Sequence, residues 1–289
     1  MSNMKVKLIL TDMDGTLFAD GEQIPKINRR ALLECEARGI RLALVSGRGH
    51  GFLSRVAKSM GLKCAIASAN GARIEASPDG PLIFEGAFPR ADGQNMFDLL
   101  YGMNVNFECY ARGVSYVLRA DKMPPRHRAS LMRNVERGDA DAVFDEERAR
   151  REAPERAYKF VVFSDDADEI NAVRRALDER GIAHCSSGSQ NVEIMPPGVG
   201  KGEAVHKIAS YFGCSREETM AFGDYTNDIP MLRACGHPVA MRNGVEAVRR
   251  VARIIAPPNT QGGLGQVIYR YVLAREPSSE RAATAREDL

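Results

Sequence analysis

The sequence predicts an α/β protein, with a Rossmann-like parallel sheet as its core and an α+β domain inserted into that core. Two observations predict this class. Short apolar runs alternate with segments of helical spacing near both ends of the chain, a rhythm typical of a parallel sheet covered by helices. The middle of the chain loses this rhythm and contains strand pairs, which indicates an antiparallel module.

The N-terminal part of the core is predicted to hold three strands and two helices. Apolar runs predict strands at Lys5–Thr11, Ile40–Val45 and Cys64–Ala69. Apolar residues recur at helical spacing over Ile24–Arg38 and Gly51–Met60, and a glycine follows each of these segments, as is common at helix ends.

The same alternation returns near the C-terminus. It predicts helices and strands in turn, at Gly202–Phe212, Thr219–Phe222, Asp228–Ala234, His237–Met241, Val245–Ala252, Arg253–Ala256 and Leu264–Ala274. Residues 276–289 are polar and lack aromatic side chains, so we expect a flexible tail there.

The middle segment is predicted to form the inserted domain. Val105–Leu118 is typical of a hairpin with Arg112-Gly113 as its turn, and Arg126–Arg156 contains helical stretches. The remaining elements expected here are Phe160–Phe163, the helix Ala167–Arg180, Ile182–Cys185 and Asn191–Ile194. The predicted division is residues 1–87 and 188–275 for the core and 88–187 for the inserted domain.

Composition and charge exclude several partners. The 40 Lys+Arg against 38 Asp+Glu leave a net charge of +2, which gives no electrostatic case for nucleic acid or a membrane surface. No apolar run approaches the roughly 18–20 residues that cross a bilayer. The cysteines are scattered, and no signal peptide is recognised, so we expect a cytoplasmic protein, either a monomer or a small homo-oligomer.

Polar residues follow the strands of the predicted core. Asp12 and Asp14 follow the first strand, and two carboxylates this close favour a bound Mg²⁺. The alternative is an ordinary turn at Asp14-Gly15 with Asp12 as a cap. Ser46-Gly47-Arg48 follows the second strand and Asn70 follows the third. In open parallel sheets ligands bind at this edge, so we expect these side chains to converge.

Two C-terminal segments add to this set. Asp224 follows the strand Thr219–Phe222 and is placed to complete a metal site. Asp228 begins a helix, where it either caps the helix or positions the other groups. Lys201 opens another helix and could neutralise a phosphate, although taken singly it is also typical of a solvated surface lysine.

Together these motifs resemble the haloacid dehalogenase (HAD) superfamily of phosphotransferases, and most closely its Cof-type sugar-phosphatase branch with a type IIB cap. The resemblance runs from Lys5 to about Ala274. Its four motifs occur in order, as Asp12-Met13-Asp14-Gly15-Thr16-Leu17, Ser46-Gly47-Arg48, Lys201, and Gly223-Asp224 through Asn227-Asp228. The inserted domain lies where this branch carries its cap, so a HAD-like core with a cap is implied.

The resemblance also implies residue roles. Asp12 is the nucleophile and Asp14 the general acid and base. Mg²⁺ is held by the side chains of Asp12 and Asp224 and by the main-chain carbonyl of Asp14. Asp228 supports the site. The residues implied to bind the phosphoryl group or the substrate are Thr16, Ser46, Gly47, Arg48, Asn70, Lys201 and Asn227.

The predicted activity is Mg²⁺-dependent hydrolysis of a small phosphorylated metabolite, a sugar phosphate above all, through an aspartyl-phosphate. Two alternatives stay open: a phosphomutase of the same superfamily, and a non-catalytic regulator that binds a phosphorylated ligand. Specificity is expected to lie in the cap. The cap residues considered for it are Glu108, Tyr110, Arg112, His184, Ser187 and Ser189.

Overall fold

A sheet of eight strands forms the core of the molecule in the computed structural model, which describes residues 4–111 and 113–273. Its strands are β1 (Leu8–Thr11), β2 (Arg41–Val45), β3 (Ala65–Ser68), β4 (Arg73–Glu75), β5 (Leu82–Glu85), β11 (Thr219–Gly223), β12 (His237–Met241) and β13 (Ile254–Ala256). They lie in the order β13-β12-β11-β1-β2-β3-β4-β5. All neighbours from β13 to β3 are parallel, and β4 and β5 add antiparallel strands at one edge.

Helices cover both faces of this first sheet. They are α1 (Lys26–Ala37), α2 (His50–Met60) and α10 (Gly263–Tyr271) on one face, and α7 (Lys201–Tyr211), α8 (Ile229–Ala234) and α9 (Glu246–Arg249) on the other. Ile9 of β1 belongs to the apolar cluster of the first group, and its neighbours Leu8 and Leu10 belong to that of the second. Burial on both faces explains why β1 is a continuous apolar run.

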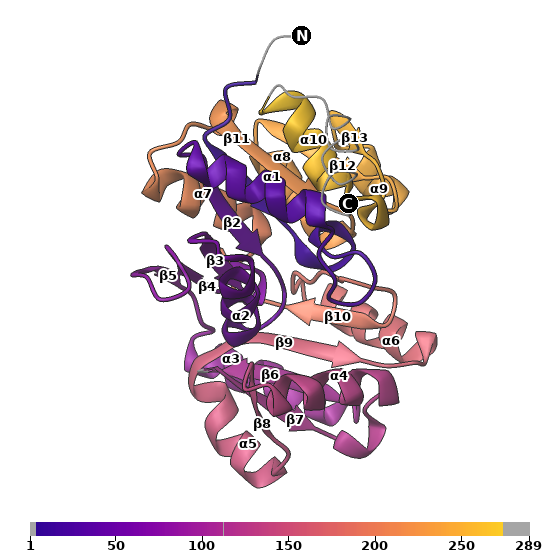
Figure 1. Ribbon diagram of the computed structural model, residues 1–289. Coiled ribbons are helices and arrows are strands. Elements are labelled where there is room, and N and C mark those ends of the chain that lie inside the picture. Colours follow the sequence, from indigo (N-terminus) through magenta and orange to yellow (C-terminus); the bar gives the residue numbers. More distant parts are fainter. Residues whose placement is uncertain (1–3, 112, 274–289) are drawn as a thin grey trace, which may run out of the picture.

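The inserted segment folds as a second sheet, which lies below the first in Figure 1. Its strands are β6 (Phe107–Ala111), β7 (Val114–Leu118), β8 (Asp141–Val143), β9 (Ala157–Phe163) and β10 (Asn191–Ile194), and its helices are α3 (Arg90–Gly102), α4 (Pro125–Glu136), α5 (Glu146–Glu152) and α6 (Ala167–Asp178). The strand order is β10-β9-β6-β7-β8, antiparallel except between β7 and β8.

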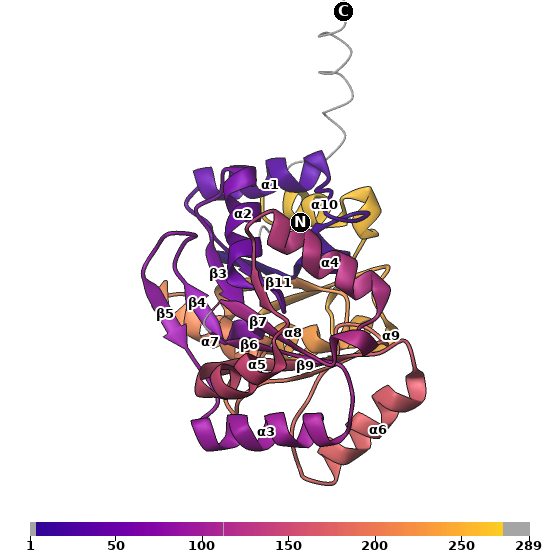
Figure 2. The ribbon, with the colours of Figure 1, turned by 90° about the horizontal axis from the view of Figure 1, so that it is seen from below.

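Alternate residues give the second sheet an apolar face and a polar face. Phe107 and Phe160 belong to the apolar cluster that α3 and α6 cover. Figure 2 shows α4 on the opposite side of β6 and β9. The register pairs Val161 of β9 with Glu108 on one side and Glu193 on the other, so these acidic residues share the second face. That face is turned toward the first sheet.

The structure confirms the predicted fold class and corrects several details. The predicted boundary at Ser187 is too early, because β10 pairs with β9 and carries the second sheet to Ile194. Ile182–Cys185 is not a strand; only a single bridge joins Cys185 to Glu193. The strands β4, β5 and β8 are short and were not predicted. The predicted tail at 276–289 lies outside the described residues.

Two further observations concern membrane-spanning helices and the cysteines. Among residues 4–111 and 113–273, no helix is long and apolar enough to span a bilayer. The six cysteines are free thiols in the structure, and four of them are buried.

Candidate active site

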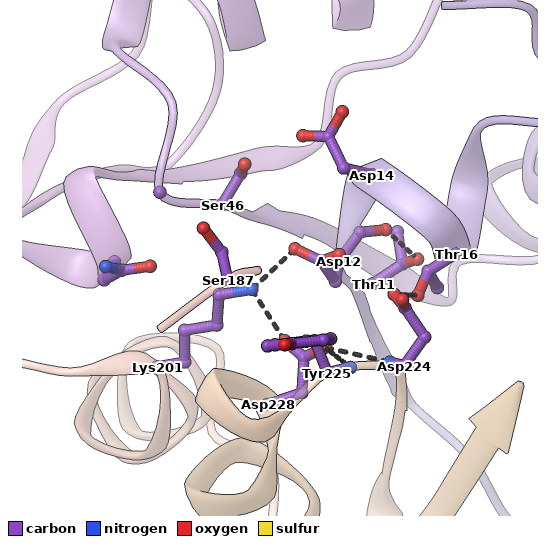
Figure 3. Close-up of polar contacts among 12 residues, drawn as sticks. Thr11, Asp12, Asp14, Thr16, Ser46, Ser187, Lys201, Asp224, Tyr225 and Asp228 are labelled. Atoms are coloured by element: carbon purple, nitrogen blue, oxygen red, sulfur yellow. Dashed lines mark hydrogen bonds and ion pairs between the residues drawn. The ribbon is translucent and has the colours of Figure 1, made fainter. Parts of the chain in front are cut away.

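The predicted site residues lie where four strands of the first sheet end. Asp12 and Asp14 follow β1, Ser46 follows β2, Asn70 follows β3 and Asp224 follows β11. Because these strands are parallel, their carboxyl ends meet at one edge of the sheet. Figure 3 shows Asp12, Ser46 and Asp224 gathered there, as the strand-end argument predicts.

Three carboxylates and one lysine form the centre of the site. Asp12, Asp224 and Asp228 each place an oxygen within 4.8 Å of the others. Lys201 Nζ lies 2.5 Å from Asp12 Oδ1 and 2.6 Å from Asp228 Oδ1, and the lysine side chain is 1% exposed. A single ammonium therefore faces three acidic groups.

The pKa values of these groups are shifted because charged groups lie close together in a buried site. Burial, followed by repulsion from Asp228, raises the pKa of Asp12 well above its usual range. The same two causes raise the pKa of Asp224 to about 7. For Lys201, burial acts to lower the pKa, but attraction to Asp12 and Asp228 outweighs it and the pKa rises. The cluster therefore carries more acidic groups than its lysine neutralises.

A hard divalent cation fits this donor set. Asp228 already uses both oxygens: Oδ1 contacts Lys201, and Oδ2 accepts the amides of Asp224 at 2.9 Å and Tyr225 at 3.1 Å. Asp12 and Asp224 are thus the carboxylates left to bind a cation, and carboxylate oxygens are the ligands that Mg²⁺ prefers. Asp228 thus contacts the lysine and the backbone of its own loop, and its supporting role in the site stays a prediction.

Asp14 is turned away from the acidic cluster. Arg48 binds its carboxylate through two atoms, with Nε 2.8 Å from Oδ2 and Nη2 2.6 Å from Oδ1. The Arg48 guanidinium lies 4.1 Å from the centre of the Phe52 ring, which holds it in place. The Asp14 side chain is half exposed and points into the space beside Asp12 (Figure 3). The use of its main-chain carbonyl as a metal ligand stays a prediction.

Thr16 differs from its predicted role. Its side chain is fully buried, and its hydroxyl donates to Asp224 Oδ1 at 2.6 Å. Thr16 therefore orients the carboxylate of Asp224, a candidate metal ligand, and its side chain does not face the cavity. Gly15, one residue earlier, has φ of 76°, and a Cβ at this position would overlap the Asp224 carboxylate.

The loops after β2 and β3 form the side of the site opposite Asp224. The Arg48 amide donates to Ser46 Oγ at 3.3 Å, so the hydroxyl is held by its own loop. Asn70 adopts a left-handed conformation with φ of 58°, and its amide donates to Glu193 of the second sheet. Asn227 is 6% exposed and lies at the border of the cavity described next.

A cavity of about 230 Å³ separates the two sheets at this point. The first sheet contributes Asp12, Asp14, Ser46, Gly47 and Arg48 to its walls. We call the first sheet with its helices the first unit, and the second sheet with its helices and loops the second unit. The residues that the second unit contributes are polar or aromatic: Tyr110, His127, Ser130, Asn134, Lys159, Phe163, Ser187, Asn191 and Glu193.

The structure brings only some of the predicted cap residues to this cavity, and their role in specificity stays a prediction. Tyr110 and Ser187 line this cavity. Glu108 is fully buried behind it, where it accepts the Ser115 hydroxyl at 2.6 Å and pairs with His127. His184 instead pairs with Asp178 and lines a different cavity. Ser189 does not line the cavity, and Arg112 lies outside the described residues.

Sequence reasoning missed Lys159 and Glu193. Each is the one charged residue of a mostly buried strand, AYKFVVF for β9 and NVEI for β10. A single charge within a buried strand is a usable signal, because such a residue is rarely fully buried unless it is paired.

The fold and the site together define a hydrolase with a Rossmann-like core, a second unit over its catalytic edge and an acidic centre. The chain belongs to the haloacid dehalogenase-like hydrolase family, whose sequence model matches residues 9–268. The resemblance predicted from the motifs is thereby confirmed. Phosphatases among its relatives support assignment of the chain as a phosphoric monoester hydrolase.

Three similar proteins illustrate this membership. The 5-amino-6-(5-phospho-D-ribitylamino)uracil phosphatase YcsE of Bacillus subtilis is 29% identical, over 94% of this chain and 98% of its own. The pyridoxal phosphate phosphatase YbhA of Escherichia coli is 24% identical, over 93% and 100%. The structure of a haloacid dehalogenase-like hydrolase from B. subtilis superposes with a TM-score of 0.82 at 23% identity, over 92% and 100%.

Proposed function

We propose that the protein is a Mg²⁺-dependent phosphatase that hydrolyses small phosphomonoesters through an aspartyl-phosphate on Asp12. The observation that carries the proposal is the position of Asp12: it directly follows β1 and lines the cavity, with Lys201 Nζ 2.5 Å from one of its oxygens and Asp224 beside it. A buried carboxylate in such a setting can attack phosphorus only if positive charge offsets its repulsion of the phosphate.

In the first step Asp12 attacks the phosphorus, and the bond from phosphorus to the ester oxygen breaks. Lys201 neutralises charge on Asp12, and the Ser46-Gly47 loop orients the phosphoryl oxygens. Mg²⁺, bound by Asp12 and Asp224, would supply charge stabilisation. Asp14 protonates the departing alkoxide, and for this its carboxyl must be released from the pair with Arg48.

In the second step water attacks the phosphorus of the aspartyl-phosphate, and the acyl oxygen leaves with its electron pair. Asp14, now a carboxylate, removes the proton from that water. The products are inorganic phosphate and the regenerated Asp12 carboxylate. One residue thus serves as acid and then as base, because the proton that it donates in one step is recovered in the next.

The cavity supports a small, polar leaving group. Its volume of about 230 Å³ is below the roughly 300–1,000 Å³ typical of drug-sized ligands. Hydroxyl, amide and charged side chains from the second unit dominate its lining, which suits the hydroxyl groups of a sugar phosphate. We propose a phosphorylated metabolite of this class as the substrate, for a cytoplasmic enzyme that is a monomer or a small homo-oligomer.

The test is hydrolysis of p-nitrophenyl phosphate and of a sugar-phosphate panel, with Mg²⁺ or with EDTA. We expect phosphate release with Mg²⁺ and the loss of most or all of this activity with EDTA. Formation of an isomeric sugar phosphate without release of phosphate would point to a phosphomutase. Tight binding of sugar phosphates with no turnover would point to a regulator.

A further inference from the structure

Lys159 is a buried lysine of the second unit that reaches the first. It lies on β9, its side chain is 4% exposed, and its Nζ donates to the carbonyl oxygen of Gly47 at 2.7 Å. Gly47 belongs to the Ser46-Gly47-Arg48 loop after β2. A charged group from one unit is therefore hydrogen-bonded to the main chain of the other, inside the cavity wall.

Glu193 of β10 holds this lysine in place. Its Oε2 lies 3.4 Å from Lys159 Nζ, and its own side chain is also 4% exposed. The same oxygen accepts the side-chain amide of Asn70, which follows β3 of the first sheet, while Oε1 accepts the Ser187 hydroxyl at 2.6 Å. Lys159 and Glu193 thus form a buried ion pair that contacts two loops of the first unit.

The hydrogen bond to Gly47 constrains the phosphate loop through peptide geometry. The Gly47 carbonyl and the Arg48 amide belong to one planar peptide group, so fixing the oxygen also fixes the direction of the N–H. That N–H donates to Ser46 Oγ at 3.3 Å. The contacts therefore run without a break from the ammonium of Lys159 to the hydroxyl of Ser46.

The packing around Gly47 is close. A Cβ at this residue would lie 3.2 Å from Asn70 Oδ1, 3.2 Å from Glu193 Oε2 and 3.4 Å from Lys159 Nζ. Three polar groups from both units thus converge on one glycine. They can do so only while the second unit rests against the first.

We propose that Lys159 and Glu193 form a latch that orients the Ser46-Gly47-Arg48 loop for phosphoryl transfer only when the two units are closed on each other. Lys159 is then a positioning residue: it acts on the reaction through the Gly47–Arg48 peptide and Ser46. The inference rests on the proposed function, since it assigns this loop to the phosphoryl group. It makes closure of the second unit a condition for an ordered phosphate site.

The experiment compares Lys159→Met, Lys159→Arg, Glu193→Gln and the double variant Lys159→Met/Glu193→Gln in the full chain, with p-nitrophenyl phosphate and Mg²⁺. We expect Lys159→Met to lower kcat by about 10²-fold, the cost of a misplaced reacting group, with an unchanged Mg²⁺ concentration for half-maximal activity. Lys159→Arg should restore part of kcat, because it keeps a charged donor.

The double variant separates positioning from simple charge balance. It removes both charges of the buried pair, so it should recover the Tm that Lys159→Met loses but leave kcat low. Recovery of kcat together with Tm, or native kcat in Lys159→Met, would overturn the proposal.

A readout without turnover separates this inference from the proposed function. The latch predicts that Lys159→Met raises the radius of gyration measured by small-angle X-ray scattering, because the closed arrangement loses a buried contact. An unchanged radius of gyration would overturn the latch even in an active enzyme. An inactive native protein whose radius of gyration still rises on substitution would contradict the phosphatase and retain the latch between the units.

Discussion

Asp12 is the residue on which the proposed chemistry depends. We predict that Asp12→Asn abolishes turnover and labelling by radioactive phosphate ester but keeps the Tm close to native, because an amide oxygen can still accept the Lys201 hydrogen bond. The exposed Asp20 offers a control, and Asp20→Asn should leave kcat unchanged. Native turnover in Asp12→Asn would rule out the assigned nucleophile.

We expect a different effect from substitution of Asp14, because its side chain faces Arg48 and not the acidic centre. Asp14→Asn should lower kcat by roughly 10²–10⁴-fold, the usual contribution of a general acid or base. The half-maximal Mg²⁺ concentration should change little if only a main-chain atom of Asp14 contacts the metal. Unchanged kcat would remove Asp14 from the mechanism.

Asp224 should make the stability of the metal-free protein fall as the pH rises. Burial and repulsion by Asp228 raise its pKa to about 7 in the folded state, above the ordinary value of 3.8. Folding therefore favours the protonated carboxyl: this contribution to stability is full below the ordinary pKa and is lost as pH rises through the folded-state pKa. In EDTA, Tm should fall between pH 5 and pH 8.

Metal and substitution provide the controls for this prediction. Mg²⁺ should raise Tm most at the upper end of the pH range, because it binds the ionised carboxylates. Asp224→Asn should flatten the pH dependence of Tm in EDTA and remove most of the increase in Tm with Mg²⁺, because the side chain no longer carries a titratable carboxylate. The local structure should be kept, since the amide oxygen of the asparagine can still accept the Thr16 hydroxyl. A native Tm that rises with pH in EDTA would contradict the assigned repulsion.

The turn after β1 shows how one element depends on a backbone conformation. Gly15 and Gly21 both have positive φ, 76° and 64°, but only Gly15 lies against the Asp224 carboxylate. Gly15→Ala should therefore lose more stability than Gly21→Ala, for which the strain of positive φ alone is about 1–3 kcal/mol. Gly15→Ala should also weaken Mg²⁺ binding. Denaturant unfolding and Mg²⁺ titration measure both, and equal losses would deny the contact with Asp224.

The type of strand pairing explains how much of the site could be predicted from the sequence. Asp12, Ser46 and Asn70 were predicted to converge because carboxyl ends of parallel strands share an edge, which needs no knowledge of long-range register. Lys159 and Glu193 were missed because their position depends on antiparallel pairing between strands distant in the chain. Local patterns carry the alternation of a strand but not the strand that it pairs with.

At the scale of the molecule, the same difficulty misplaced the end of the inserted unit. β10 has only four residues and follows a connection without regular structure, so its membership of the second sheet appears only in its pairing with β9. The core was easier to predict from the sequence, because its apolar strands and amphipathic helices alternate along the chain. Burial on both faces marks such strands in the sequence itself.

Ion pairs outside the cavity also join the two units. Arg55 of α2 places Nε 2.8 Å and 2.6 Å from the two oxygens of Asp139, whose side chain is 3% exposed. Arg55→Gln should leave Asp139 buried without its partner and favour an open arrangement, in which water reaches the carboxylate. We expect a larger radius of gyration and a higher KM.

Arg137 provides the matched control for that substitution. It pairs with Glu22 at 2.7 Å, but its side chain is 45% exposed, and exposed pairs contribute little. Arg137→Gln should therefore leave the radius of gyration and KM near their native values. Equal effects of the two substitutions would show that burial of Asp139 is not what holds the units together.

The two-faced second sheet has a consequence for how substrate preference can change. Residues such as Phe107 and Phe160 stabilise the unit from one face, while Tyr110 and Ser187 meet the cavity from the other side. Mutations that alter recognition thus need not disturb the hydrophobic packing. Natural drift or a directed-evolution library restricted to cavity-facing positions could explore new metabolites at small thermodynamic cost, provided that Lys159 and Glu193 are kept.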